Sequence, residues 1–203
     1  MATKLLADAL READVPRVKD LLQRGADPNA QVGPGIHFIL LATAHPKKGK
    51  NLALVNALLD AGANPNIGHG TTSLHLASKE GNLPVVQALL AKDAAVNVVD
   101  DDGATPLYFA SGDGHLPVMQ ALLAKGAAVD AAANDGAKPL HIASHNGHLP
   151  VVQALLAKGA AVDATRHDSV TPLCLASQGG HLEVVQAPRA PRWTLRRKTA
   201  GLP

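Results

Sequence analysis

Apolar and polar positions repeat along this chain with a period of 33 residues, and residues 101–133 show the unit most clearly. Two short apolar segments at helical spacing, residues 106–111 and 116–125, predict a pair of helices. Thr105 can cap the first helix, and Pro106 stands in its first turn, where proline costs no hydrogen bond. Glycines after each segment allow the positive φ that such turns need. Because one short helical pair cannot bury its own apolar face, we expect stacked copies.

Copies of the unit do precede and follow it. Residues 136–141 (GAKPLH) correspond to residues 103–108 (GATPLY), and residues 147–150 (GHLP) to residues 114–117. The elements G-x-TPLH, GHLPVVQALL and GAAVDA at this spacing resemble the ankyrin repeat, over about residues 3–187. This resemblance implies an all-α solenoid of stacked helix–turn–helix units joined by β-hairpin-like fingers.

We therefore expect one repeat domain over residues 1–187 and a basic, disordered tail over residues 188–203. The first repeat lacks the TPLH signature and carries a polar outer face, as an N-terminal cap requires. The expected repeats are 3–31, 32–66, 67–99, 100–132, 133–165 and a partial sixth, 166–187.

The second and third repeats depart from the pattern. In the second, Phe38 stands where proline is usual, and the connection at residues 45–51 is about four residues longer than elsewhere. We interpret this connection as a drifted surface loop, with a functional loop as the alternative. In the third, the short connection from Asn66 to Gly70 predicts a shorter finger, and Asp93 replaces the capping glycine.

The sixth repeat stops in mid-motif. Pro188 and Pro191 follow directly and predict that its second helix ends after one turn. Residues 188–203 hold five of the 19 Lys and Arg and none of the 17 acids, so the rest of the chain has 14 bases and a net charge of −3. The tail is either a true basic extension or the product of a shifted reading frame. Since basic clusters bind phosphates, contact of the tail with nucleic acid or an acidic membrane is an alternative function, which charge alone supports weakly.

Composition narrows the setting of the protein. No apolar run approaches the ~20 residues that span a bilayer. The acid-containing N-terminus indicates an amphipathic helix rather than a secretion signal. Cys174 is the only cysteine, which agrees with a reducing compartment. We expect a cytoplasmic protein, with the nucleus or delivery into a host cell as alternatives.

Histidine is the only abundant reactive residue type. His75 and His141 occupy the last position of TPLH, and His115, His148 and His181 follow the glycine of GHLP. In the family that the chain resembles, the first set holds the loops through hydrogen bonds and the second lies in the turn between helices. Five of the ten histidines are therefore expected to be structural.

The remaining chemistry is sparse. His141, His145 and His148 lie close in sequence, but no acidic or cysteine partner completes the four ligands of a structural zinc site. Cys174 stands in a TPLH histidine position, where we expect it to be packed between repeats and not to be a low-pKa nucleophile. The sequence has no GxSxG, HExxH, Walker or CxxC motif. We expect no catalysis, metal, cofactor or small-molecule substrate.

The resemblance implies a non-catalytic protein–protein interaction module or adaptor that binds a partner protein on its concave face of finger tips and first helices. The acidic residues there favour a basic segment of the partner, while the usual hot-spot types are limited to Tyr108 and Arg166. A regulatory or substrate-presenting subunit of an enzyme complex is the alternative, and we expect a monomer. The implied contact residues are His69, Thr71, Lys79, Glu80, Asp101, Asp102, Ala104, Asp113, Asn134, Asp135, His145, Asn146, His167, Asp168 and Gln178.

Overall fold

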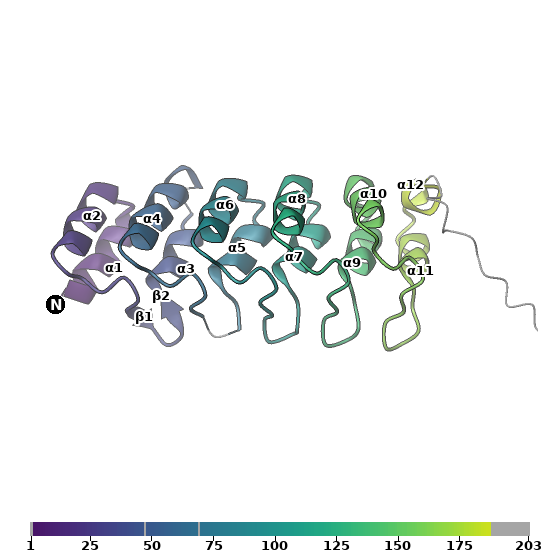
Figure 1. The fold of residues 1–203 in the computed structure, drawn as a ribbon, viewed down its shortest axis with the longest axis horizontal. Coiled ribbons are helices and arrows are strands. Elements are labelled where there is room, and N and C mark those ends of the chain that lie inside the picture. Colours follow the sequence, from purple (N-terminus) through teal and green to yellow (C-terminus); the bar gives the residue numbers. More distant parts are fainter. Residues whose placement is uncertain (1, 47, 69, 188–203) are drawn as a thin grey trace, which may run out of the picture.

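The computed structural model describes residues 2–46, 48–68 and 70–187, and consists of helical pairs stacked in a row (Figure 1). The prediction of an all-α solenoid is confirmed. His69 and the tail at residues 188–203 lie outside the described residues. The helices are α1 (Ala2–Glu12), α2 (Val15–Gln23), α3 (Phe38–Thr43), α4 (Lys48–Asp60), α5 (Ser73–Lys79), α6 (Leu83–Ala91), α7 (Pro106–Gly112), α8 (Leu116–Ala124), α9 (Pro139–His145), α10 (Leu149–Ala157), α11 (Pro172–Gln178) and α12 (Leu182–Val185).

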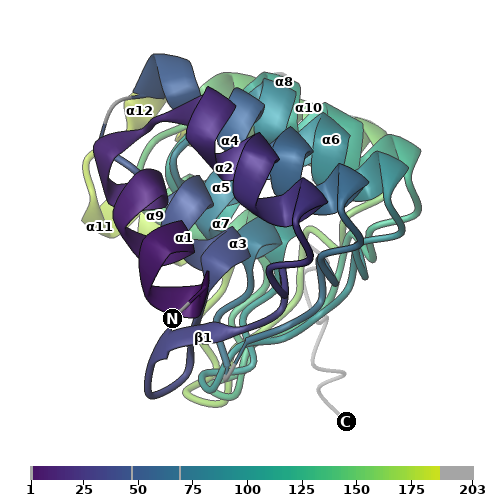
Figure 2. The same cartoon turned by 90° about the vertical axis from the view of Figure 1, so that its left-hand side faces the viewer.

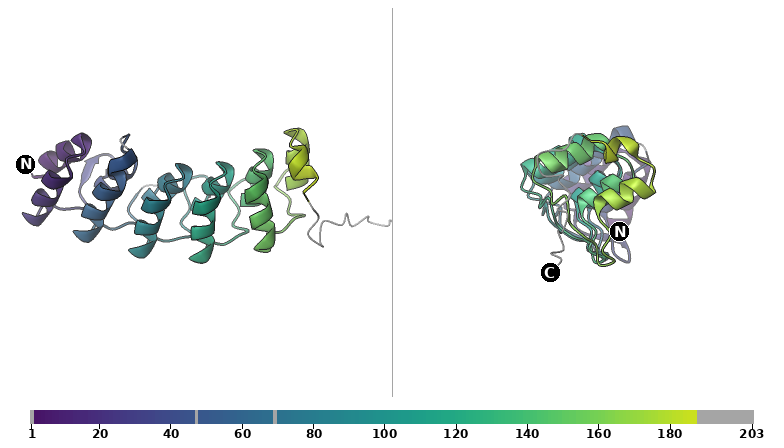
Figure 3. Two further views of the ribbon diagram at one scale, coloured as in Figure 1. Left: turned by 90° about the horizontal axis from the view of Figure 1, so that it is seen from above. Right: turned by 90° about the vertical axis from the view of Figure 1, so that its right-hand side faces the viewer.

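The helices form two layers. Viewed along the row, the odd-numbered first helices lie in one layer, the even-numbered second helices lie in the other, and the connections between pairs project from them as fingers (Figure 2). The view from above shows each pair beside the next (Figure 3). The core runs between the layers, where Leu107, Met119 and Leu122 are fully buried. Burial of each such side chain contributes about 1.5–3 kcal/mol, and much of it depends on the neighbouring pair.

Local sequence sets the ends of each helix. In α7 the Thr105 hydroxyl accepts a hydrogen bond from the Tyr108 amide at 3.3 Å, and Pro106 fills the first turn as predicted. Gly114, between α7 and α8, has a φ of +74°. Asp93, which replaces a capping glycine, takes the left-handed conformation with a φ of +61°, again as predicted.

The fingers are held mainly by turns. In the described residues a strand pair occurs in the first finger, where β1 (Gln31–Gly33) pairs antiparallel with β2 (Ile36–His37). A later finger closes through a backbone hydrogen bond from Asp100 to Ala104 at 3.0 Å. Among the described residues, no helix is long and apolar enough to cross a membrane.

The prediction of a longer loop at residues 45–51 was wrong. Helix α4 begins at Lys48, so the additional residues lengthen this helix to 13 residues, against 9 in α6. Asn51 explains why the helix extends, because its buried side chain donates a hydrogen bond to the Thr43 carbonyl at 2.6 Å. This bond satisfies a carbonyl at the end of α3, which a mobile loop would leave to solvent.

Asparagines in the turns after the second helices connect neighbouring pairs. The side-chain NH2 group of Asn97 donates to the Gly126 carbonyl at 3.3 Å, and its side-chain oxygen accepts from the backbone amide of Ala128 at 2.8 Å. Asn66 and Asn29 make the same two bonds one and two units earlier, respectively. At the next interface Asp130 keeps the acceptor bond to Ala161, but a carboxylate has no hydrogen to donate.

The two hydrogen bonds of the Asn97 side chain predict the effect of Asn97→Asp. This change keeps the acceptor oxygen, removes the donor to Gly126, and places a second oxygen against that carbonyl. We expect the free energy of unfolding to fall by about 1 kcal/mol. For a chain of this size, that corresponds to a fall of about 2–4 °C in Tm, measurable by thermal unfolding.

Asn56→Asp is the matched control, because Asn56 is exposed on α4 and no hydrogen bond of its side chain is found in the described part of the chain. An equal loss of stability in both variants would mean that the added charge, and not the lost bond, is responsible.

Candidate functional site

The candidate site is the inner face on which the fingers and the first helices meet (Figure 2). Thirteen of the fifteen predicted contact residues are exposed at finger tips or at the C-terminal ends of first helices: Thr71, Lys79, Glu80, Asp101, Asp102, Asp113, Asn134, Asp135, His145, Asn146, His167, Asp168 and Gln178. His69 lies outside the described residues. Ala104 is only 4% exposed, because it lies at the base of its finger and not at the tip where the sequence predicted it.

Two of the exposed residues also hold the framework together. The Asn134 side chain donates to the Asp101 carbonyl of the preceding finger at 3.0 Å. The Asn146 side chain donates to the Gly112 carbonyl of the preceding first helix at 2.7 Å. A substitution at either position would therefore disturb stacking as well as any contact with a partner.

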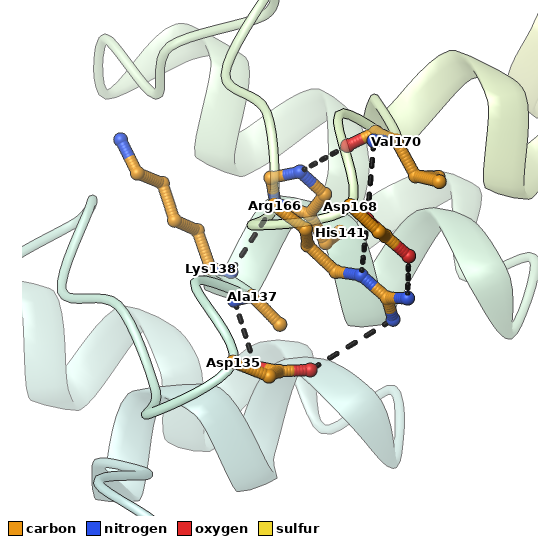
Figure 4. Close-up of polar contacts among 7 residues, drawn as sticks. All are labelled: Asp135, Ala137, Lys138, His141, Arg166, Asp168 and Val170. Atoms are coloured by element: carbon orange, nitrogen blue, oxygen red, sulfur yellow. Dashed lines mark hydrogen bonds and ion pairs between the residues drawn. The ribbon is translucent and has the colours of Figure 1, made fainter.

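Charges on this face are mostly negative in its central part. Asp101 and Asp102 lie on one finger, and Asp113 caps the C-terminal end of α7 in the same repeat. Further along, Arg166 lies between two carboxylates (Figure 4). Its guanidinium donates to Asp168 on its own finger and lies 3.8 Å from Asp135 on the preceding one. Hydrogen bonding to Arg166 holds the pKa of Asp168 below its usual range.

Buried histidines bridge neighbouring repeats in the forward direction. His75 Nδ1 accepts from the Thr72 amide at 3.2 Å, and His75 Nε2 lies 3.1 Å from the Ala104 carbonyl of the next finger. Because a carbonyl only accepts, Nε2 carries the proton and the ring is neutral. His141 makes the same contacts, to the Lys138 amide at 3.2 Å and the Val170 carbonyl at 3.3 Å (Figure 4).

A second set of histidines bridges in the reverse direction. His115, His148 and His181 each place Nε2 at 2.8 Å from a carbonyl near the C-terminal end of the preceding first helix. Each ring also lies against a glycine: a Cβ on Gly81 would come within 2.6 Å of the His115 ring. The sequence analysis expected these histidines only to lie in the turn between helices. The structure shows that they also connect each repeat to the one before it.

The described part of the chain contains cavities at two places where a framework histidine is replaced. Asn82 stands in the GHLP histidine position of the third repeat, and beside it a cavity of about 380 Å³ lies between Thr43, Leu76 and Asn82. Tyr108 stands in the TPLH position of the fourth repeat, and cavities of about 350 and 80 Å³ lie on its two sides. The larger cavity beside Tyr108 opens onto the inner face, where its walls include the exposed finger residues Asp102, Asn134 and Asp135.

The sequence analysis did not predict the larger cavity beside Tyr108, although four of its lining residues, Asp102, Ala104, Asn134 and Asp135, were among the predicted contacts. Its walls come from two fingers and from α7, and are both acidic and aromatic: Asp100, Asp102, Ala104, Tyr108, Phe109, Ala133, Asn134 and Asp135. The departure from TPLH to TPLY is the sequence signal that marks it.

Cys174 differs from its prediction. It was expected to be packed between repeats, yet it is exposed, because it lies in the last pair that the structure describes and no further pair covers it there. The Thr171 hydroxyl donates to its Sγ at 3.3 Å and lowers the pKa of the thiol. In the described residues, no group of three or more His, Cys, Asp or Glu side chains is arranged to hold a metal ion.

Comparison with known proteins agrees with the repeated architecture. A family model for ankyrin repeats (3 copies) matches residues 39–133 and 128–187. The chain is 38% identical over 87 residues to the E3 ubiquitin-protein ligase KEG of Arabidopsis thaliana, a match covering 42% of this chain and 5% of that protein. It is 30% identical over 92 residues to the mitochondrial disaggregase of Bos taurus, covering 45% of this chain and 13% of that protein. The chain thus spans a small part of either relative.

The forward-bridging histidines predict that acid weakens the fold. Burial lowers the pKa of His75 and His141 below 6.5, the value expected in the unfolded chain. Their contribution is therefore complete above about pH 6.5 and declines as pH falls below it, because the unfolded state binds the protons more readily. The free energy of unfolding should fall by at most about 1.4 kcal/mol per pH unit for each histidine.

Urea unfolding at several values between about pH 7.5 and pH 5 measures this slope, by the linkage of protonation to stability. The double variant His75→Gln and His141→Gln should show a shallower slope than the original protein. His167→Gln changes an exposed histidine and serves as the control. An unchanged slope in the double variant would show that other groups cause the acid sensitivity.

Proposed function

Because the chain belongs to the ankyrin-repeat family, we propose that it binds a partner protein on the inner face of its fingers and first helices. Ankyrin repeats generally serve as protein–protein interaction modules, and the family is typically non-catalytic. The observation that carries the proposal is the separation of roles within each repeat. Framework residues recur and are used for stacking, while exposed residues such as Asp101, His145 and Gln178 differ from the residues at the equivalent positions of the other repeats on the same face.

The partner segment that this face fits is basic. Asp101, Asp102 and Asp113 are exposed and all belong to the fourth repeat. Complementary charge accelerates encounter and selects among partners more than it strengthens binding, so we expect an interaction of moderate affinity that weakens with salt. The lone cysteine, Cys174, supports a reducing compartment such as the cytoplasm.

A regulatory or substrate-presenting part of an enzyme complex is the second candidate. The two relatives named above carry enzymatic names, and the similar segment is a small fraction of each. An ankyrin array in such a setting would still act by binding, so both candidates require the same face.

Selection of peptides from a random library on the immobilised protein tests the proposal. We expect enriched peptides to be rich in Arg and Lys. Reversal of three charges, Asp101→Lys, Asp102→Lys and Asp113→Lys, should weaken their binding at least about tenfold, because like charges then face each other. Binding of the selected peptides is measured by fluorescence anisotropy at two salt concentrations.

The matched control reverses three acids on second helices, Asp20→Lys, Asp60→Lys and Glu183→Lys, which produces the same change in net charge. Binding should be nearly unchanged in this control. Failure to enrich any peptide, or an equal loss in both triple variants, would contradict the proposed face.

A further inference from the structure

The forward bridge between repeats is replaced at one position by a tyrosine. His75 and His141 are each 1% exposed and fill the seam to the next finger, where each ring reaches a carbonyl. Tyr108 occupies the equivalent position of the fourth repeat and is only half-buried. No hydrogen bond of its hydroxyl is found within the described residues. The tyrosine therefore leaves the seam open where the histidines close it.

The open seam is a cleft of about 350 Å³ between the fingers of the fourth and fifth repeats. Asp100 and Asp102 come from one finger and Asp135 from the next, while Tyr108 and Phe109 of α7 form the floor. The two rings meet edge to face, with centroids 6.0 Å apart. A cleft with an aromatic floor and carboxylates on opposite sides has the composition that binds a flat cation.

Partners already made inside the protein limit which groups remain available. Asp100 Oδ1 accepts from the amides of Asp102 and Ala104 at 3.0 and 2.8 Å, so it serves mainly to shape the finger. Asp135 lies 3.8 Å from Arg166. Among the described residues, the Asp102 carboxylate has no ion-pair partner, and it is exposed. It is the charge in the cleft that is most available to a ligand.

Two cationic side chains of this protein already lie beside the aromatic residues of the cleft. On the other side of Tyr108, the guanidinium of Arg166 lines the smaller cavity and lies between Asp135 and Asp168 (Figure 4). The ammonium of Lys79 lies over the Phe109 ring, 5.9 Å from its centroid. The aromatic face that remains for an incoming cation is that of Tyr108. Burial raises the pKa of the Tyr108 hydroxyl, with a further contribution from the charge of Asp135, so the ring stays neutral.

We propose that the cleft beside Tyr108 binds the guanidinium of an arginine side chain in the partner's basic segment. A guanidinium can stack on the tyrosine ring and donate two parallel hydrogen bonds to the Asp102 carboxylate, which an ammonium cannot do. This inference rests on the proposed function and makes the fourth repeat the anchor of the interaction.

The test is an NMR titration of the whole chain at low salt with Nα-acetyl-arginine amide. Tyr108 is the only tyrosine, so its ring signals report on the cleft without ambiguity. We expect saturable shifts of these signals. The citrulline analogue, in which a neutral urea replaces the guanidinium, should bind about tenfold more weakly, the combined size of a cation–π contact and a partly exposed ion pair. Absence of saturable shifts, or equal binding of citrulline, would overturn the proposal.

Two variants separate this cleft from general acidity. Asp102→Asn should weaken binding of the arginine probe several-fold, whereas Asp163→Asn should leave it unchanged, because Asp163 is exposed but lies outside the cleft and is not one of the proposed contact residues. An equal effect of both changes would mean diffuse electrostatic attraction and would overturn the assignment. Equal binding of Nα-acetyl-lysine amide would overturn the preference for a guanidinium.

Tyr108→His restores the framework residue. Its ring should close the seam toward Ala137, as His75 does toward Ala104, so a Tm at or above that of the original protein shows that the variant folds. Binding of the arginine probe, followed through the backbone amide signals of Asp102 and Asp135, should be lost. If library peptides still bind this variant with unchanged affinity, the cleft assignment fails while the proposed binding face stands. If no library peptide binds the original protein, the proposed function itself fails.

Discussion

The stacking of one helical pair on the next is the interaction on which the rest of this structure depends. Each pair presents apolar side chains on two sides, and residues such as Leu107 and Met119 are fully buried because a neighbouring pair covers them. The histidine and asparagine bridges fix the spacing of the stack, since each connects a side chain of one repeat to backbone groups of another. Nearest-neighbour contacts of this kind make stability a sum over interfaces, so a weak interface stays local.

This division of labour is what makes the inner face available for recognition. Backbone positions of the fingers are held by the framework, so exposed residues at their tips can vary without loss of the fold. The departures from the framework are informative for the same reason. A histidine that fills a seam is replaced by Asn82 at one interface and by Tyr108 at another, and a cavity lies beside each. Of these two cavities, the larger one beside Tyr108 combines aromatic residues with carboxylates from two fingers.

The last described pair of helices is shorter and more exposed than the pairs in the middle of the stack. Helix α12 has four residues and its Leu182 is 66% exposed, whereas the equivalent helices α8 and α10 each have nine residues. Cys174 occupies the position that the next repeat covers at His75 and His141, and it is exposed in the last described pair. Position in the array, and not residue type alone, therefore decides whether a framework side chain is buried.

The amino-acid sequence was sufficient to predict the period, the helical pairs, the glycine turns and the framework residues, because these features depend on local propensities and on a repeat that is visible in the sequence. It also placed thirteen of the fifteen proposed contacts at exposed positions. Other features became visible only in the tertiary structure. Residues 48–51 extend a helix, and Tyr108 borders an open cleft. Ala104, which was expected to be exposed, is buried, and Cys174, which was expected to be buried, is exposed. The helix extension depends on the hydrogen bond from Asn51 to Thr43 within one repeat. The other outcomes depend on whether, and with which residues, the adjacent repeat covers the position, and such contacts join residues about one repeat apart in the chain.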